Sequence, residues 1–133
     1  MASTIRLELV TPERLLLAEE VDEVIAPGYE GEFGVLPDHT PFLTILKIGV
    51  LRYRKGSETR KIAVGGGFAE VGPDRVVVMA DVAEKAEEID LERARRAHAR
   101  AESALKEASL DEETHAKAAS ALQRAIARMA AAE

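Results

Sequence analysis

Hydrophobic and polar residues alternate along most of the first 82 residues of the chain. In the segment IRLELV, Ile5, Leu7 and Leu9 fall on one side while Arg6 and Glu8 fall on the other. This two-residue period is that of a half-buried β-strand. No stretch of this first part keeps a helical period for three turns, so the pattern predicts a β-rich region.

Turn-forming residues divide this region into short runs, as is typical of a sandwich or barrel. They stand at Pro27-Gly28, Gly31, Pro37-Asp38, Gly49, Lys55-Gly56-Ser57, Gly65-Gly66-Gly67 and Gly72-Pro73-Asp74. The clearest predicted hairpin is FAEVGPDRVVVMA, and the triglycine segment 65–67 is interpreted as a tight turn or bulge. Because an antiparallel sheet must bury its apolar face, we predict an antiparallel β-sandwich over residues 1–86.

From Ala83 onward alanine dominates, and Gly and Pro are absent. The pattern predicts two antiparallel helices in a hairpin over residues 87–133, roughly 18 to 20 residues and about 30 Å per arm. Asp90 is the expected N-cap of the first helix, and Ser109 or Asp111 that of the second. The expected seam joins Leu91, Ala94, Ala101, Leu105 and Ala108 to Ala118, Leu122, Ala125, Ile126 and Met129. A buried methyl contributes only ~0.8 kcal/mol, so the two arms should dock weakly.

Composition restricts the possible functions. The chain is 47% apolar and 32% charged, which is typical of a soluble protein that folds. Its net charge of −6 argues against a nucleic-acid partner. The absence of cysteine excludes a disulfide framework and a thiolate metal site, and it favours a reducing compartment. No signal peptide and no apolar run of membrane-spanning length are visible, so we expect a soluble or peripheral protein.

The arginines of the helical half are the main candidates for chemistry. Arg93, Arg96 and Arg100 share one helix face by their spacing, and Arg124 and Arg128 share another. In an antiparallel hairpin these two faces should lie opposite each other. Charged runs are most often solvated helix surfaces, whereas converging guanidinium groups also suit phosphate oxygens. The residues alone leave both interpretations open.

No sequence pattern indicates catalysis. His39, His98 and His115 are not at metal-ligand spacing, and the triglycine segment lacks the Lys-Ser/Thr of a phosphate-binding loop. Neither a nucleophile motif nor a zinc-protease motif is present. We therefore predict a protein with no catalytic residues and no metal site.

Four segments in the same order resemble the epsilon subunits of bacterial F-type ATP synthases. They are LVTPER, EGEFGVLPDHTPFLT, IAVGGGFAEVGPDRVVVMAD and AEKAEEIDLERARRA, which together span nearly the whole chain. The resemblance implies a non-catalytic rotor subunit at the cytoplasmic face of the inner membrane, without direct membrane insertion. Its sandwich would bind the gamma subunit and the ring of c subunits. Its helical hairpin would extend toward the alpha and beta catalytic subunits and inhibit ATP hydrolysis.

The resemblance also implies particular site residues. In several members the folded hairpin binds ATP through an Ile/Leu-Asp-x-x-Arg-Ala motif, which this chain has at residues 89–94. The implied ATP site comprises Glu84, Ile89, Asp90, Arg93, Ala94, Arg100, Arg124 and Arg128, with ATP as a regulatory ligand and no cofactor required. Glu30, Glu32 and His39 match the region that faces the c ring, and Lys117, Arg124 and Arg128 would make the inhibitory contact. Two alternatives stay open: a purely steric helical brake without useful ATP binding, and a free-standing nucleotide-sensing adapter that does not bind gamma.

Overall fold

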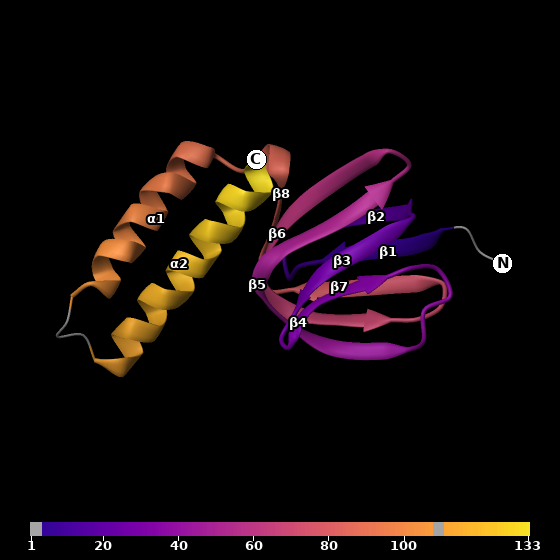
Figure 1. Ribbon diagram of the computed structural model, residues 1–133, viewed down its shortest axis with the longest axis horizontal. Coiled ribbons are helices and arrows are strands. Elements are labelled where there is room, and N and C mark those ends of the chain that lie inside the picture. The colour runs from indigo at the N-terminus through magenta and orange to yellow at the C-terminus, as the bar shows by residue number, and fades with distance from the viewer. Residues whose placement is uncertain (1–3, 108–110) are drawn as a thin grey trace.

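The computed structural model describes residues 4–107 and 111–133 (Figure 1). The strands are β1 (Ile5–Val10), β2 (Leu15–Val21), β3 (Glu23–Gly28), β4 (Gly31–Val35), β5 (Phe42–Lys55), β6 (Glu58–Val71), β7 (Arg75–Ala80) and β8 (Ala83–Lys85). A 3-10 turn, η1 (Ala86–Glu88), leads to helices α1 (Leu91–Leu105) and α2 (Glu112–Ala132). The predicted order of a β-sandwich followed by a two-helix hairpin is confirmed.

The strands hydrogen-bond in the order β2-β1-β7-β6-β5-β3-β4, with β8 added to β6. Strands β5 and β6 are each 14 residues long and run through both layers, so one continuous sheet folds over itself. The first half of β5 and the second half of β6 lie with β7, β1 and β2, and the remaining halves lie with β3, β4 and β8. All pairs are antiparallel except β1 with β7, which is parallel and departs from the prediction.

The two long strands correct the predicted turn at Gly49 and the turn alternative for the triglycine segment. Gly49 lies inside β5, and the triglycine segment lies inside β6, where that strand leaves β7 and turns toward β8. Gly67 has a φ of 114°, and a Cβ there would lie 2.1 Å from the carbonyl oxygen of Met79. The glycines therefore allow a sharp bend within one strand, the usual means by which a strand passes between packed sheets. Pro27-Gly28 likewise ends β3 instead of forming the turn.

The predicted alternation of β1 is confirmed by its burial. Ile5, Leu7 and Leu9 are fully buried, whereas the residues between them are not. The largest other fully buried side chains of the core are Val21, Val24, Val35, Leu51, Ile62, Val64, Val76 and Val78. The sandwich therefore has its own apolar core, separate from the helices.

Both helices begin at aspartate caps. The Asp90 carboxylate accepts from the backbone N–H of Arg93 at 3.1 Å, and the Asp111 carboxylate accepts from that of Thr114 at 2.7 Å. Of the two candidates for the second cap, the structure assigns Asp111, while Ser109 and the seam residue Ala108 lie outside the described residues. The arms are 15 and 21 residues long, so the hairpin is less symmetric than predicted.

Helix α2 lies between α1 and the sandwich (Figure 1). Ala127 and Ala131 pack on a sandwich face formed by Ala63, Ile48 and Val50, together with Ile89. The buried alanines of the other seam are Ala94 and Ala101 on α1 and Ala118 and Ala125 on α2.

The seam prediction was wrong for Ile126, which is 42% exposed. Successive residues of a helix are about 100° apart. Ala125 and Ala127 therefore point to nearly opposite sides of α2, one toward α1 and the other toward the sandwich. Ile126 lies between them and faces solvent.

Candidate functional site

A cavity of about 460 Å³ lies where the helices meet the sandwich. Its lining combines the end of the sandwich, the turn before α1, the first turns of α1 and one residue of α2. Seven of its lining residues belong to the predicted ATP site: Glu84, Ile89, Asp90, Arg93, Ala94, Arg100 and Arg128. Val82, Glu88 and Ala97 complete the lining and were missed, because only the fold brings them to this place.

Regular backbone structure positions the charged side chains of the cavity. Glu84 is held by β8, where it is the pairing partner of Ala63 on β6. Arg93 and Arg100 are separated by two turns of α1 and so share one side of that helix. Arg128 reaches the same space from α2.

Each carboxylate of the cavity already has a partner. Glu84 accepts from Arg128 at 2.5 Å, and both side chains are 31% exposed. Asp90 is occupied as the cap of α1. Glu88 accepts from the Lys85 backbone N–H at 2.9 Å and from Arg14. These two interactions, the backbone hydrogen bond foremost, lower the pKa of Glu88 and keep it ionised.

Arg93 and Arg100 differ from these paired groups. Within residues 4–107 and 111–133, no ion pair joins either guanidinium group to a carboxylate. Arg93 lies in the first turn of α1, whose positive dipole end also favours an anion, and Arg100 lies two turns further along the helix. The cavity therefore offers two available cations beside an apolar wall of Val82, Ile89 and alanines. This combination suits a ligand with phosphates and a flat apolar part.

Arg124, the remaining predicted ATP-site residue, does not line this cavity. It borders a smaller adjoining space that also contacts Glu84 and Arg128, one helical turn nearer the tip of the hairpin. Arg96, which the hairpin geometry also placed at this junction, is exposed and is not among the lining residues. The structure therefore brings one arginine of α2, Arg128, into the cavity with Arg93 and Arg100, instead of the two that were predicted.

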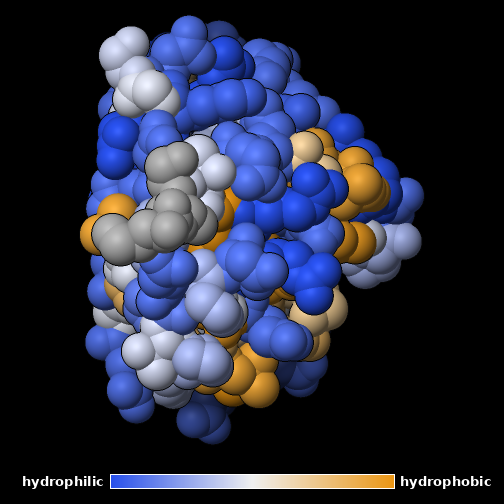
Figure 2. Space-filling view, turned by 90° about the vertical axis from the view of Figure 1, so that its right-hand side faces the viewer, coloured by the Kyte–Doolittle hydropathy of each residue, from blue (hydrophilic) through white to orange (hydrophobic). Residues whose placement is uncertain are grey.

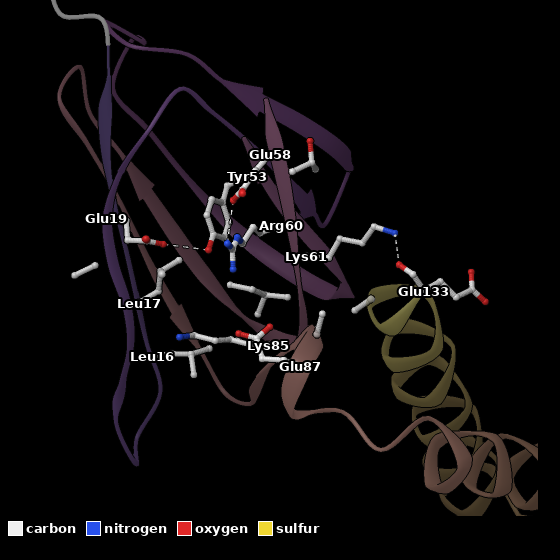
Figure 3. A pocket seen from close by; sticks show the side chains of 15 residues that line it. Leu16, Leu17, Glu19, Tyr53, Glu58, Arg60, Lys61, Lys85, Glu87 and Glu133 are labelled. Carbon is white, nitrogen blue, oxygen red and sulfur yellow. Dashed lines mark hydrogen bonds and ion pairs between the residues drawn. The ribbon is translucent and has the colours of Figure 1, made fainter. Parts of the chain in front are cut away.

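A second cavity, of about 660 Å³, lies between β2, the β5–β6 hairpin and the end of α2 (Figure 3). Its lining has four carboxylates and three cations, so it has no clear preference for an anion. Arg60 pairs with Glu58 at 2.9 Å. The Tyr53 hydroxyl donates to Glu19 at 3.1 Å, and burial, followed by the charge of Glu19, raises the pKa of Tyr53 to about 12. We therefore take the smaller cavity as the candidate site.

The predicted c-ring residues lie in and beside the turns on either side of β4. Glu30 is exposed in the turn between β3 and β4, and Glu32 on β4 pairs with Arg52 at 3.3 Å. His39 lies in the following loop, with its ring 6.4 Å from that of Phe42. Phe42 also packs edge-on against Phe33 of β4, so the loop that carries His39 lies beside the strand that carries Glu32.

The predicted inhibitory residues lie on α2. Lys117 is exposed and pairs at 3.5 Å with Glu113, one turn earlier in the same helix. Lys117 and Arg124 border a common surface hollow near the free end of the hairpin. Arg128 is different, because its pair with Glu84 ties it to the sandwich.

The described residues offer neither a metal site nor a membrane-spanning helix. In the parts of the chain that the structure describes, no group of three His, Cys, Asp or Glu side chains is placed to hold a metal ion. Across residues 4–107 and 111–133, neither helix combines the length and the apolar character needed to cross a membrane.

Comparison with known proteins relates the chain to one family. Residues 4–86 match the family "ATP synthase, Delta/Epsilon chain, beta-sandwich domain", and residues 87–133 match the corresponding "long alpha-helix domain". The chain is 55% identical to the ATP synthase epsilon chain of Syntrophobacter fumaroxidans, covering 100% of this chain and 98% of that one. It is 54% identical to that of Nitratidesulfovibrio vulgaris, over 97% and 96% of the two chains. A chain in the mitochondrial ATP synthase structure of Euglena gracilis, which contains F1 and the c-ring, is 28% identical with a TM-score of 0.87, covering 100% of this chain and 84% of that one.

Proposed function

The chain belongs to the epsilon subunits of F-type ATP synthase, and we propose that it is a central-stalk rotor subunit that helps couple proton flow to ATP synthesis. In this proposal it is a non-catalytic, peripheral subunit at the cytoplasmic face of a bacterial inner membrane. Its sandwich binds gamma and the c ring, and its hairpin regulates the alpha and beta subunits. The bacterial relatives and the Euglena complex with F1 and a c-ring support this role.

An apolar strip on the outer face of the sandwich supports a gamma contact. Leu43 and Ile45 on β5 are 67% and 64% exposed, and Phe68, the cross-strand partner of Ile45, is 43% exposed. Exposed apolar side chains gathered on a sheet are typical of an interaction surface. Figure 2, which views the end of the sandwich away from the helices, shows apolar patches within a mainly hydrophilic surface. We assign gamma to the strip, and the c ring to the loops with Glu30, Glu32 and His39.

The cavity at the foot of the hairpin supports ATP as the regulatory ligand. The observation that carries this proposal is that Arg93 and Arg100 have no carboxylate partner in the described residues and share one cavity with Arg128. Phosphate groups would bridge the two helices there, with Arg124 approaching from the adjoining space. The apolar wall would receive the base.

Bridging of the two helices gives a switch. A ligand that binds only the folded hairpin stabilises that state in proportion to its concentration over its Kd. When the ATP concentration falls, α2 separates from α1 at the alanine seam and from the sandwich. Lys117, Arg124 and Arg128 are then available to acidic segments of the catalytic subunits, and ATP hydrolysis is inhibited.

An ATP titration of the purified chain by calorimetry tests the site. We expect saturable binding that Arg93→Ala and Arg128→Ala each weaken about 10- to 100-fold, the range for charge-assisted hydrogen bonds. Arg95→Ala is the matched control, because Arg95 is exposed on the same helix and pairs with Glu92 outside the cavity. Absence of binding, or equal weakening by the control, would refute the nucleotide site.

Removal of residues 90–133 tests the inhibitory role in the assembled enzyme. We expect the truncated subunit to raise ATP hydrolysis at low ATP, because no helix remains to reach the catalytic subunits. Unchanged hydrolysis would contradict inhibition by the hairpin and leave the rotor role untouched.

One observation favours the steric brake as a second candidate. Arg128 is already paired with Glu84, so the hairpin is fastened to the sandwich without any ligand. In that case millimolar ATP leaves the chain unchanged, and only the truncation alters hydrolysis.

A further inference from the structure

The turn between β1 and β2 is held in a fixed shape by its own residues. The backbone N–H of Thr11 donates to the carbonyl of Arg14 at 2.9 Å, and the N–H of Arg14 returns to the Thr11 hydroxyl at 3.3 Å. Thr11 is buried, and Pro12 has a restricted φ. The turn is therefore a rigid support for the Arg14 side chain.

Arg14 reaches across the molecule to the turn that precedes α1. Its Nη2 donates to both carboxylate oxygens of Glu88, at 3.0 and 2.8 Å, across 74 positions of sequence. Glu88 also accepts from the backbone N–H of Lys85. The carboxylate is thus fixed from both sides, and its lowered pKa agrees with this arrangement.

Glu88 lies in the linker between the sandwich and α1. It ends η1 and directly precedes Ile89 and Asp90, which line the candidate cavity as Glu88 itself does. The strand before it, β8, has only three residues, and on the other side Ile89 packs with Ala127 and Ala131. The anchored Glu88 is therefore the polar contact among those that set the direction in which α1 leaves the sandwich.

We propose that Arg14 is a positioning residue for the nucleotide site, acting through Glu88. It fixes the linker that presents Ile89, Asp90 and the start of α1 to the ligand. It also offsets the negative charge of Glu88, which would otherwise face an incoming phosphate. The inference rests on the proposed ATP site, but the linker geometry can be measured without ATP.

The first measurement compares ATP binding by the full chain and its Arg14 variants. Arg14→Gln is expected to raise the Kd about two- to fivefold, which matches a partly exposed ion pair. Arg14→Lys should stay near the wild-type value, because a single nitrogen makes both contacts in the structure. Arg60→Gln is the control, since it removes another exposed arginine, which pairs with Glu58 and is not part of the cavity lining.

A double variant separates positioning from a general effect of charge. If Arg14 acts through Glu88, then Arg14→Gln has no further effect on the Kd in a Glu88→Gln background. Full additivity of the two changes would overturn the proposal. An increase of the Kd in Arg60→Gln equal to that in Arg14→Gln would overturn it as well.

Hydrogen exchange of the Lys85 amide, measured without ATP, gives an independent readout. Arg14→Gln should speed this exchange, because a released Glu88 no longer holds the amide, and Arg14→Lys should not. If the wild-type chain binds no ATP, the nucleotide site is wrong, and the Lys85 exchange rate alone decides whether Arg14 positions the linker. An exchange rate unchanged by Arg14→Gln overturns the positioning role in either case.

Discussion

Lys61 fastens the end of α2 to the sandwich, and its removal should favour opening of the hairpin. Its ammonium group donates to the main-chain oxygen of Ala130 at 3.4 Å and to that of Glu133 at 3.3 Å, the second of which Figure 3 shows. Ala130 lies in the last turn of α2 and Glu133 is its C-cap, at the end where a helix has its negative dipole end and unpaired carbonyls. Lys61→Met keeps the aliphatic stem and removes only the charged donor.

The expected magnitude follows from this geometry. Both hydrogen bonds are long and exposed to solvent, so we assign them a combined contribution of about 0.5 to 1 kcal/mol to docking of α2. That range corresponds to a population of undocked hairpin roughly two to five times larger. The sandwich core does not depend on this side chain, because Lys61 lies outside it.

A thiol-trapping assay measures this population, and the chain is well suited to it because it has no cysteine. Ala127→Cys places one thiol on the face of α2 that packs on the sandwich, where it reacts only when the hairpin opens. Lys61→Met should accelerate its modification about two- to fivefold. A thiol at Ala69→Cys, inside the sandwich core, should react at an unchanged rate.

The matched control is Lys117→Met, at the other end of α2. Among residues 4–107 and 111–133, the ion pair of Lys117 is with Glu113 of the same helix, and no ion pair or hydrogen bond joins Lys117 to the sandwich. The reasoning is refuted if Lys61→Met leaves the Ala127→Cys rate unchanged, or if Lys117→Met accelerates it equally.

Three further predictions concern the fold. The pKa of Tyr53 is raised from 10.0 to about 12, so the stability that its neutral hydroxyl contributes is complete below pH ~10 and is lost as pH rises toward 12. An absorbance titration should show this late ionisation of Tyr53, and Glu19→Gln should lower its pKa. Gly67→Ala should abolish folding of the sandwich, judged by circular dichroism, because its Cβ would overlap the Met79 carbonyl at a φ of 114°. Asp111→Ala should reduce the helical circular dichroism signal of α2, because the cap of that helix is removed. In the wild-type chain the same loss of helical signal should appear as pH falls through the lowered pKa of Asp111.

The sequence was sufficient where the structure depends on local periodicity. The alternation around Leu7 identified the inward side of β1, Asp90 identified where α1 begins, and Asp111 was one of the two candidates for the start of α2. It was insufficient where one residue type serves two structures. Glycine marks turns and also permits bends within a strand, so Gly49 was assigned to a turn and the triglycine segment to a tight turn or bulge, although both lie inside strands of 14 residues.

Contacts between distant segments account for the remaining differences. Arg14 and Glu88 are 74 residues apart, and no spacing rule relates a turn of the sandwich to the cap of a helix. The position of Arg124 depends on the register between α1 and α2, which a repeated alanine pattern does not fix. Helical periodicity gave the side of α2 on which Arg128 lies, and only the packed hairpin showed that it meets Glu84.

The packing of α2 explains why a small ligand can control the hairpin. The residues that it buries on both sides are alanines, each contributing only ~0.8 kcal/mol per methyl, and α1 packs mainly on α2. The entropy of ordering two helices opposes even this small gain. Docking therefore depends on a few polar contacts, those of Lys61 and Arg128 among them. A ligand at 100 times its Kd stabilises the state that it binds by about 2.7 kcal/mol, which is comparable to the sum of such contacts. A seam of larger side chains would hold the hairpin closed whether or not the ligand was bound, so the alanines are what make regulation by a ligand possible.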